Sequence, residues 1–574
     1  MYSFNELRKV SKTQVEGKEI KVAVLGNAST QFFSKSLEGF CKLNNLNAII
    51  FDADYNQIDL QLFDNNSETY HFQPDYILIW MASEMLYEEF LNTGVEEKPL
   101  FAEKCLSKIK SYWGFIKENT NAKIIQFNFS EIDDRALGNY SAKVEETFIY
   151  QLRKLNYLLS EAMIKEGNVF PIDISSVQNR FGFAFTYNPV LFYSSKMSTS
   201  IDVLPYISKQ VVDVIKSSLG LFKKCLIMDL DNTIWGGVIG DDGINNIEIG
   251  ELGRGHVFSD LQRWIKQLKE FGIILAVCSK NNEKTAKEPF EKHPDMILRL
   301  SDISIFVANW DDKASNIKLI QESLNIGMDS IVFIDDNPFE RELVKNIIPD
   351  ICVPDLPDDP SLYLGYLQEQ NLFEAPSFAG KNSDRTMQYQ AQFERKKMET
   401  AYSSIDGYLK DLEMVCSARS FEETQFSRIA QLSQRSNQFN LRTVRYTDED
   451  IKRIANDKNY ITLSCSLKDK FGDYGLVSVV IIKKTNANTG FVDTWLMSCR
   501  ALKRGLEEFT VNKMISLCKE NGVMILEAEY IPTPKNNMVK DIYSSFGFKR
   551  EEENRFCIDV NNYQEKNNYI KEIK

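Results

Sequence analysis

Residues 223–233 read KKCLIMDLDNT, and their apolar part, residues 225–228, ends at two carboxylates, Asp229 and Asp231. A short apolar run that ends in polar residues predicts a strand buried in a parallel sheet. Side chains two residues apart on a strand point to the same side, so both carboxylates can face one pocket. One can then attack phosphorus while the other protonates the leaving oxygen and later activates water. A turn with two solvated acids is the alternative for this stretch taken alone.

Three further features fall near the ends of later apolar runs. Ser279 ends the run IILAVCS, where its hydroxyl can hold a phosphoryl oxygen or cap a helix. Lys313, in NWDDKASNIK, offers a compact positive charge to a phosphate or is a surface lysine. Asp335 and Asp336 follow the run SIVFI. Because the carboxyl ends of parallel strands meet at one edge of a sheet, we expect these side chains to converge with Asp229.

Four carboxylates at one sheet edge repel each other unless a cation lies between them. Oxygen ligands and an expected phosphate substrate together point to Mg²⁺. The metal would also reduce the repulsion between the nucleophile and the phosphate. We therefore predict Mg²⁺ as the cofactor and a phosphorylated small molecule as the substrate.

This order of motifs resembles that of the haloacid dehalogenase (HAD) superfamily over residues 221–354. The resemblance implies that Asp229 is the nucleophile and a metal ligand. It also implies that Asp231 is the general acid and base, and that its main-chain carbonyl is a further metal ligand. The other implied roles are phosphate binding by Ser279, Lys313 and Thr233, metal binding by Asp335, and support from Asp336 and Asn281.

Strand-like and helix-like segments alternate along the rest of the chain. The run IKVAVLGNAST begins a β-α-β pattern, and further strands are predicted at residues 76–80 and 123–127. An open, mostly parallel sheet with helices on both faces follows from this alternation. Near the C-terminus, strands are predicted at residues 460–467, 476–483 and 490–498, and the tail YQEKNNYIKEIK is expected to be a frayed helix.

The sequence around the motifs resembles a narrower group. The runs DLDNTIWGGVIGDDG, VCSKNNE, NWDDKASNI and FIDDNPFERE are similar to the FkbH-like proteins of HAD subfamily IIIC. Members of that group load a glyceryl unit from 1,3-bisphosphoglycerate onto an acyl carrier protein. The runs RIAQLSQRSNQFNLRTVRYT, FGDYGLVSVV and WLMSCRALKRGLEE resemble the group's C-terminal region, which is similar to GNAT acyltransferases. The N-terminal region occupies the place of the group's SGNH-hydrolase-like domain.

We therefore predict a multidomain α/β protein. The expected parts are an SGNH-like or flavodoxin-like α/β domain at 1–218, a Rossmann-like HAD domain at 219–356, a helical connector at 357–415 and a GNAT-like α+β domain at 416–574.

Cys499, in the run MSCR, is the predicted acceptor of the acyl group. Arg500 beside it would lower the pKa of the thiol or hold a phosphate. A buried cysteine at a strand end is the alternative. Coenzyme A is normally cradled by an Arg/Gln-x-x-Gly-x-Gly/Ala loop, but Lys503 takes the place of the first glycine. This departure disfavours ordinary use of acetyl-CoA, whereas the phosphopantetheine arm of a carrier protein can still be accommodated.

The run GNAS, which contains Ser29, invites a serine-hydrolase interpretation of the N-terminal region. Such chemistry needs a base, but no histidine follows Asp173 in the run FPID, and His71 lies in a polar stretch. We predict that this domain is not a hydrolase of that kind and instead docks partners or substrate.

Composition excludes several classes of function. The net charge of -13 and the scattered basic residues argue against a nucleic-acid binder. The 10 cysteines include no CxxC pair, which favours a reduced intracellular protein and, with only 3 histidines, disfavours a zinc site. The N-terminus is too polar for a signal peptide, and no stretch approaches the roughly 20 apolar residues of a membrane helix. We expect a cytoplasmic protein without membrane insertion.

Three functional hypotheses follow. The first is a glyceryl transferase and phosphatase that acts on 1,3-bisphosphoglycerate and an acyl carrier protein in polyketide or surface polysaccharide biosynthesis. The second is a phosphatase of small sugar or acid phosphates fused to an acyltransferase module. The third is a non-catalytic scaffold, which the presence of all the HAD motif residues disfavours.

Overall fold

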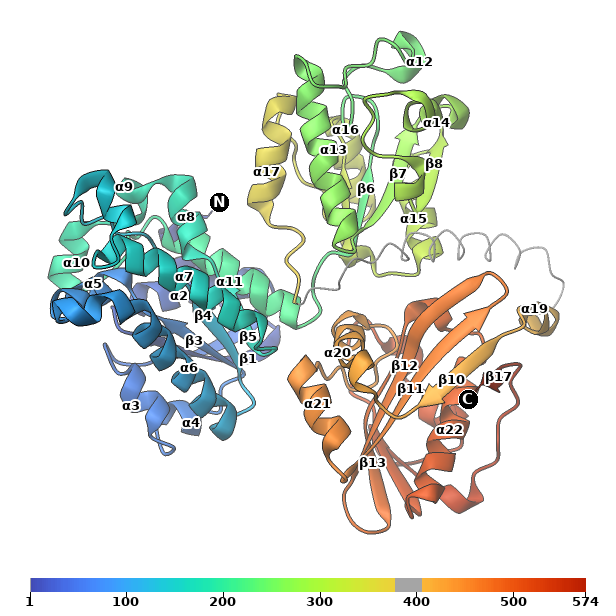
Figure 1. Ribbon diagram of the computed structural model, residues 1–574. Coiled ribbons are helices and arrows are strands. Elements are labelled where there is room, and N and C mark those ends of the chain that lie inside the picture. The colour runs from blue at the N-terminus through green and yellow to red at the C-terminus, as the bar shows by residue number, and fades with distance from the viewer. Residues whose placement is uncertain (1, 377–404, 574) are drawn as a thin grey trace. The chain divides into compact units, whose positions relative to one another are not determined.

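The computed structural model describes residues 2–376 and 405–573 (Figure 1). These residues belong to two compact units, Met1–Lys216 and Ser217–Lys574, and each is described by itself. Residues 377–404 of the predicted helical connector lie outside the described part of the chain. Within the described residues, every helix is too short or too polar to cross a membrane.

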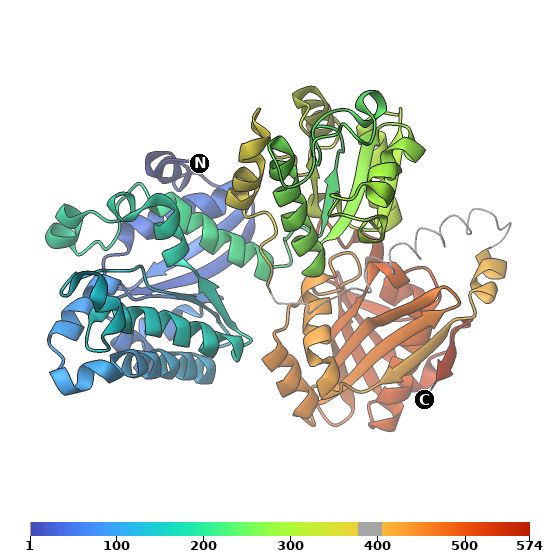
Figure 2. The same ribbon diagram turned by 45° about the horizontal axis from the view of Figure 1, so that its top comes forward.

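The first unit contains a five-stranded sheet in the order β2-β1-β3-β4-β5, and all of its strands are parallel. Its strands are β1 (Lys18–Gly26), β2 (Leu46–Asp52), β3 (Tyr76–Trp80), β4 (Lys123–Phe127) and β5 (Val169–Ile172). Helices cover both faces of this sheet (Figure 2). The helices are α1 (Phe4–Val10), α2 (Gln31–Leu43), α3 (Ile58–Phe63), α4 (Glu68–Phe72), α5 (Ser83–Leu91), α6 (Phe101–Asn119), α7 (Phe148–Ile164), α8 (Ile174–Phe181), α9 (Phe183–Thr186), α10 (Pro189–Ser195) and α11 (Leu204–Ser218), whose last two residues belong to the second unit.

The second unit begins with a four-stranded parallel sheet in the order β8-β7-β6-β9. Its strands are β6 (Cys225–Met228), β7 (Ile274–Lys280), β8 (Ile305–Asn309) and β9 (Ile331–Ile334). The helices of this part are α12 (Ile239–Asp242), α13 (Arg254–Glu270), α14 (Glu283–Lys292), α15 (Lys313–Leu324), α16 (Pro338–Ile347) and α17 (Tyr363–Gln370).

Alternate residues of these short strands are buried on opposite faces. Leu226 and Met228 pack in one apolar cluster with residues of α13 and α17. Cys225 and Ile227 pack in the other cluster with residues of α15 and α16. Burial on both faces is the reason why each strand reads as a continuous apolar run.

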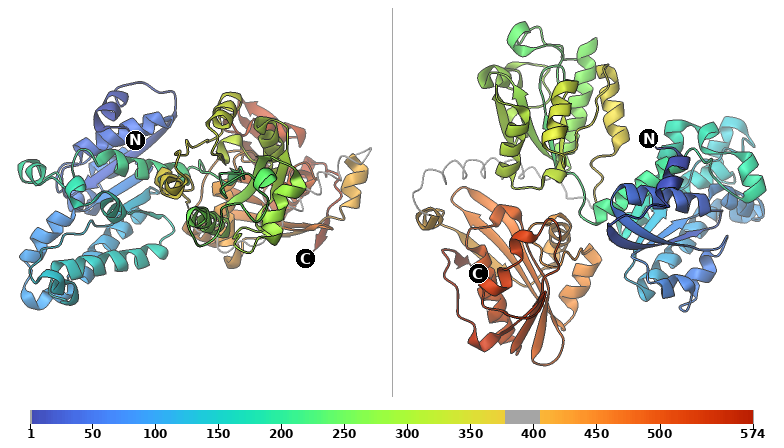
Figure 3. Two further views of the ribbon diagram at one scale, coloured as in Figure 1. Left: turned by 90° about the horizontal axis from the view of Figure 1, so that it is seen from above. Right: turned by 180° about the vertical axis from the view of Figure 1, so that it is seen from behind.

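The rest of the second unit is built on an eight-stranded, mostly antiparallel sheet in the order β15-β16-β14-β13-β12-β11-β10-β17. Its strands are β10 (Val415–Arg419), β11 (Tyr460–Asp469), β12 (Gly472–Lys484), β13 (Thr489–Met497), β14 (Ile525–Glu529), β15 (Lys549–Glu552), β16 (Arg555–Asp559) and β17 (Lys571–Ile573). The helices are α19 (Ile405–Asp411), α20 (Phe426–Arg435), α21 (Asp448–Asn456), α22 (Leu506–Glu520) and α23 (Ile542–Ser545). Helices α20 and α21 pack on one face of the sheet and α22 on the other, and α22 comes forward in the back view of Figure 3. The predicted multidomain α/β fold class is confirmed.

The prediction of a frayed helix for the C-terminal tail is wrong. Residues Lys571–Ile573 form β17, which pairs in parallel with β10. Ile570, just before this strand, is buried. The free edge of β10 offers main-chain partners that the polar composition of the tail does not reveal.

Gln262 of α13 holds the loop after β6 in place. Its Nε2 donates to the main-chain oxygen of Ile234 at 2.7 Å, and its Oε1 accepts from the main-chain N–H groups of Ile297 and Leu298, each at 3.1 Å. The side chain is fully buried. One amide therefore satisfies three main-chain groups.

We expect Gln262→Leu to lower the free energy of unfolding of the second unit by about 3 kcal/mol, because the buried main-chain groups lose their partners. Denaturant titration followed by the fluorescence of this unit's tryptophans measures the change. Gln267→Leu, on the exposed side of the same helix, is the matched control and should alter stability little. Equal stability of the two variants would contradict this role for Gln262.

Candidate functional site

The ends of three neighbouring parallel strands bring the predicted site residues together. Asp229 follows β6, Ser279 is the second-last residue of β7, and Asp335 follows β9. Lys313 begins α15, shortly after β8. Because β6 pairs with β7 on one side and β9 on the other, these residues lie at the carboxyl edge of one sheet.

Lys313 forms the central ion pairs of this edge. Its Nζ lies 2.9 Å from Oδ2 of Asp229 and 2.5 Å from Oδ2 of Asp335. Burial lowers the pKa of Lys313, but the two carboxylates outweigh it and the net shift is upward. The lysine therefore stays charged and fixes the orientation of both carboxylates.

The carboxylates around Lys313 fit a divalent cation. Asp229, Asp335 and Asp336 each offer one oxygen, and these oxygens lie within 4.8 Å of one another. Oδ1 of Asp229 is buried and has no hydrogen-bond partner within the described residues. Burial, together with the Asp229 carboxylate, raises the pKa of Asp335 to about 7 and also raises that of Asp336. One lysine thus leaves negative charge uncompensated, and oxygen-only donors of this kind suit Mg²⁺.

Asp231 is held differently from Asp229, although the two are only two residues apart. Its Oδ1 accepts hydrogen bonds from Nε1 of Trp235 and the main-chain N–H of Ile239, and its Oδ2 accepts one from Nδ2 of Asn281, all at 2.9 Å. Burial raises the pKa of Asp231 despite these bonds. A carboxyl group that is held in place and more easily protonated than usual suits a general acid. Metal binding through its main-chain carbonyl stays a prediction.

Thr233, in the loop after β6, contacts Asp336, in the loop after β9. Its hydroxyl donates to the Asp336 carboxylate at 3.2 Å and accepts from the Asp336 main-chain N–H at 3.0 Å. The side chain is fully buried, so the structure gives it a positioning contact, and its phosphate binding stays a prediction. Ser279 is also buried, next to Ala308 of β8 in the sheet register.

Two positioning residues were missed in the sequence. Trp235 is completely buried and bonds Asp231. Arg341 of α16 is buried, and its Nη1 donates to the main-chain oxygens of Asp335 and Asp336 at 2.9 and 2.7 Å. The run FIDDNPFERE contained this arginine, but a helix arginine is usually exposed, and only the turn after β9 directs it back to the aspartates.

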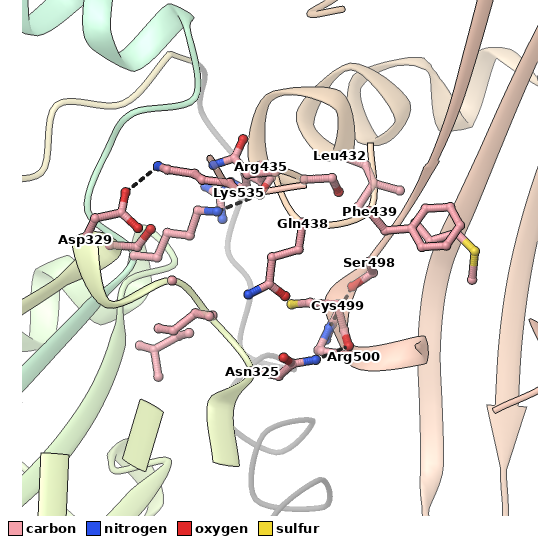
Figure 4. Close-up of a pocket in the computed structure, with 18 of the residues that line it drawn as sticks. Asn325, Asp329, Leu432, Arg435, Gln438, Phe439, Ser498, Cys499, Arg500 and Lys535 are labelled. Atoms are coloured by element: carbon pink, nitrogen blue, oxygen red, sulfur yellow. Dashed lines mark hydrogen bonds and ion pairs between the residues drawn. The ribbon is translucent and has the colours of Figure 1, made fainter. Parts of the chain in front are cut away.

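Cys499, the predicted acyl acceptor, lies elsewhere in the second unit. It begins a short 3₁₀ helix after β13 and lines a cavity of about 460 Å³ (Figure 4). Its main-chain oxygen accepts a hydrogen bond from Nδ2 of Asn325 at 2.6 Å. Burial raises the pKa of the thiol, and the nearby Lys224 and Arg500 offset only part of that effect. The expected lowering by Arg500 is therefore present but smaller than the effect of burial.

The cavity lies at the amino edge of the four-stranded sheet. Lys224 and Ser330, which line it, immediately precede β6 and β9, and Ile274 is the first residue of β7. Asp229 follows the opposite end of β6. The predicted catalytic residues therefore do not form one cluster, and Cys499 is separated from the carboxylates by the length of a strand.

The basic residues just before α22 form hydrogen bonds within the chain. The main-chain N–H of Lys503 donates to the Glu507 carboxylate at 2.8 Å. The Arg504 side chain donates to the main-chain oxygen of Arg500 and to the Tyr408 hydroxyl, both at 3.3 Å. A pyrophosphate would have to displace the Glu507 carboxylate, which adds to the case against an ordinary coenzyme A loop.

In the first unit, the residues of the serine-hydrolase interpretation have other partners. The Ser29 hydroxyl donates to Oε1 of Gln31, and the Asp173 carboxylate caps α8 by accepting from the Ser176 main-chain N–H. The His71 ring contacts the main-chain oxygen of Ser67. That this domain is not a serine hydrolase stays a prediction.

Comparison with known proteins finds one family and one solved structure that are similar to large parts of the chain. The FkbH N-terminal domain family matches residues 21–216. The N-terminal part of the protein BF1531 from Bacteroides fragilis, whose crystal structure contains a phosphatase domain complexed with Mg, is 43% identical, with a TM-score of 0.63. That similarity covers 66% of this chain and 100% of the Bacteroides structure.

Two acetyltransferase structures also match the chain. A GNAT-family acetyltransferase from Streptococcus pneumoniae is 16% identical, with a TM-score of 0.20, and the match covers 25% of this chain and 98% of the Streptococcus chain. A spermidine N-acetyltransferase from Vibrio cholerae, in complex with CoA and spermine, is 10% identical, with a TM-score of 0.21. That match covers 26% of this chain and 97% of the Vibrio chain. Similarities this low carry no functional argument. No match was found among curated proteins.

We expect Lys313→Met to lower the free energy of unfolding of the second unit by about 3 kcal/mol at pH 8 without metal, because buried carboxylates lose their cation. The loss should be smaller at pH 5, where protonation of Asp335, with its pKa of about 7, removes negative charge. Thermal unfolding in EDTA at both pH values measures this. Lys318→Met, on the exposed side of α15, is the control, and a pH-independent loss would contradict the assignment.

Proposed function

Because the chain belongs to the FkbH-like, HAD-type family of the Bacteroides phosphatase-domain protein, we propose that it is a Mg²⁺-dependent phosphatase with Asp229 as its nucleophile. The observation that carries this proposal is the pairing of Asp229 and Asp335 through Lys313, with one buried Asp229 oxygen that has no partner among residues 2–376 and 405–573. The third hypothesis, a non-catalytic scaffold, gives no reason to bury Asp229 and Asp335 around one lysine with Asp336 beside them.

In the proposed reaction, a carboxylate oxygen of Asp229 attacks phosphorus, and the bond from phosphorus to the leaving oxygen breaks. Asp231 gives its proton to that oxygen and then takes a proton from the water that hydrolyses the aspartyl-phosphate. Asn281 and Trp235 hold the Asp231 carboxyl in place throughout. Asp229, Asp335 and Asp336 would hold Mg²⁺, which would neutralise charge on the phosphate. Lys313 and Ser279 bind the other phosphoryl oxygens.

The finer part of the proposal concerns the acyl group. Following the first hypothesis, the chain takes a glyceryl unit from 1,3-bisphosphoglycerate, and Cys499 carries it before transfer to an acyl carrier protein in polyketide or surface polysaccharide biosynthesis. The cavity at Cys499, which is larger than a thiol alone requires, supports this role. The alternative is a phosphatase of small sugar or acid phosphates joined to an acyltransferase module. Only the first requires a thioester on Cys499.

We expect Asp229→Asn to reduce Mg²⁺-dependent phosphate release from acyl and sugar phosphates by at least about a thousandfold, because an amide is a poor nucleophile. EDTA should silence the wild-type protein, and Mg²⁺ should restore it. Phosphate release is measured with each substrate under both conditions. Asp260→Asn, at a partly exposed carboxylate on α13, is the matched control. Wild-type rates in Asp229→Asn would rule out the nucleophile assignment.

Asp231→Asn should discriminate between leaving groups. Hydrolysis of an alkyl phosphate needs a proton on the leaving oxygen, whereas p-nitrophenolate leaves without one. We expect the first half-reaction of the variant to slow by about a hundredfold or more with the alkyl ester, and much less with p-nitrophenyl phosphate. The initial burst of alcohol or p-nitrophenolate, measured by rapid quench, isolates this half-reaction. An equal loss with both substrates would argue against Asp231 as the acid.

A further inference from the structure

The first unit contains two small polar pockets at the carboxyl edge of its five-stranded sheet. The residues common to both linings are Glu84, Ser130, Ile174, Ser198 and Thr199. Each pocket has a volume of about 10 Å³, which is room for one water-sized guest. Ligands of open parallel sheets bind at this edge, so we asked which guest these residues suit.

Three neighbouring strands bring the pocket residues together. Glu84 lies in the first turn of α5, shortly after β3. Ser130 follows β4, and Ile174 begins α8 directly after β5. Because β4 pairs with β3 on one side and with β5 on the other, the ends of these strands meet at one place.

A later segment, residues 196–200, supplies another wall of both pockets. The main-chain oxygen of Lys196 accepts a hydrogen bond from the Ser29 N–H at 2.9 Å. The Ser200 N–H donates to the main-chain oxygen of Thr186, also at 2.9 Å. The segment is thus held on both sides of the two pocket residues at positions 198 and 199.

Glu84 is a buried acid without a cationic partner. Its side chain is buried, and the residue is only 8% exposed. Within the described part of the chain, the single hydrogen bond that reaches its carboxylate comes from its own main-chain N–H, and no charged group offsets its burial. No basic side chain lines either pocket. A buried carboxyl group in this position must either hold a proton or gain a cation.

Neutral oxygen atoms surround this carboxyl group. The hydroxyls of Ser198 and Thr199 make no hydrogen bond to any residue that the structure describes. The Ser130 hydroxyl lies 3.3 Å from that of Ser83. Tyr187 lines one of the pockets, and burial together with the Glu84 charge raises the pKa of its hydroxyl, so Tyr187 stays neutral. The pockets therefore offer several oxygen ligands and one negative charge.

This charge matches a monovalent ion better than a divalent one. Glu84 is the one acidic side chain in the two linings. Mg²⁺ and Ca²⁺ sites in proteins usually contain more than one carboxylate or retain several waters, and these pockets have little room for water. An ion with a single charge leaves no excess of either sign in the buried space.

We propose that Glu84, with oxygen atoms of Ser130, Ser198 and Thr199, binds a monovalent metal cation, Na⁺ or K⁺, at the carboxyl edge of the five-stranded sheet. The ion neutralises the buried carboxylate and joins α5, the loop after β4 and the segment 196–200. The site lies in the first unit and is independent of the chemistry of Asp229.

A proton and the cation compete for this carboxylate. Burial raises the pKa of Glu84 to about 7. At pH 8 the group is charged and binds the cation, whereas at pH 5 it is protonated and does not. Stabilisation by the cation is therefore present above the pKa of about 7 and lost as the pH falls through it.

Hydrogen exchange of the full-length protein at pH 8, followed by mass spectrometry, tests the site. Chlorides of Na⁺, K⁺ and tetramethylammonium are compared at equal ionic strength, with EDTA added as its tetramethylammonium salt. We expect Na⁺ or K⁺ to slow exchange in peptides from residues 80–90 and 196–203 about tenfold relative to tetramethylammonium, which is too large for the pockets. Peptides from β11, in the second unit, are the internal control and should exchange equally in all three salts.

Two variants and a second pH assign the effect to the carboxylate. Glu84→Gln should exchange equally in the three salts, whereas Glu89→Gln, at an exposed position of the same helix, should keep the wild-type response. The wild-type response should also disappear at pH 5, which covers the case in which Glu84→Gln fails to fold. Equal exchange of the wild-type protein in all three salts at pH 8 would overturn the proposal, as would a response that persists in Glu84→Gln or at pH 5.

Discussion

The Lys313 ion pairs are the constraint on which the carboxyl edge of the four-stranded sheet depends. Parallel strands bring Asp229, Asp335 and Asp336 to one place, where their charges repel in a setting that excludes water. Lys313 compensates part of that charge, and its two short contacts fix the positions of Asp229 and Asp335. Thr233 and Arg341 then hold the turn that carries the aspartate pair. The negative charge that remains uncompensated makes this edge suited to a divalent cation.

Much of this edge could be predicted from the sequence. An apolar run predicts a buried parallel strand, and the end of the run marks the sheet edge where polar side chains meet. Asp229, Lys313 and Asp335 were all found by that reasoning. Trp235 and Arg341 were missed, since nothing in a local pattern distinguishes a side chain that turns back to a loop from one that is exposed or packed. The prediction for the C-terminal tail failed for a related reason. The tail forms β17 because it pairs with the edge of β10, which is far away in the sequence.

The residues that surround Cys499 could not be predicted from the sequence. Its local run shows a strand end and a neighbouring arginine, but the partners of the cysteine are Asn325, before β9, and Lys224, before β6. Those residues come from turns at the amino edge of another sheet, and turns of this kind carry no periodic signal. Likewise, the local run does not reveal that the Glu507 carboxylate accepts a hydrogen bond from the Lys503 main-chain N–H.

The four residues of β6 thus separate the carboxylates after the strand from the cavity that Cys499 lines. In the proposed function, Asp231 activates water, which would also attack a thioester. Because Asp231 and Cys499 lie at opposite edges of the sheet, Asp231 would act on phosphate esters without consuming a thioester on Cys499. Under that proposal, one small sheet separates a reaction that needs water from a reaction that water would prevent.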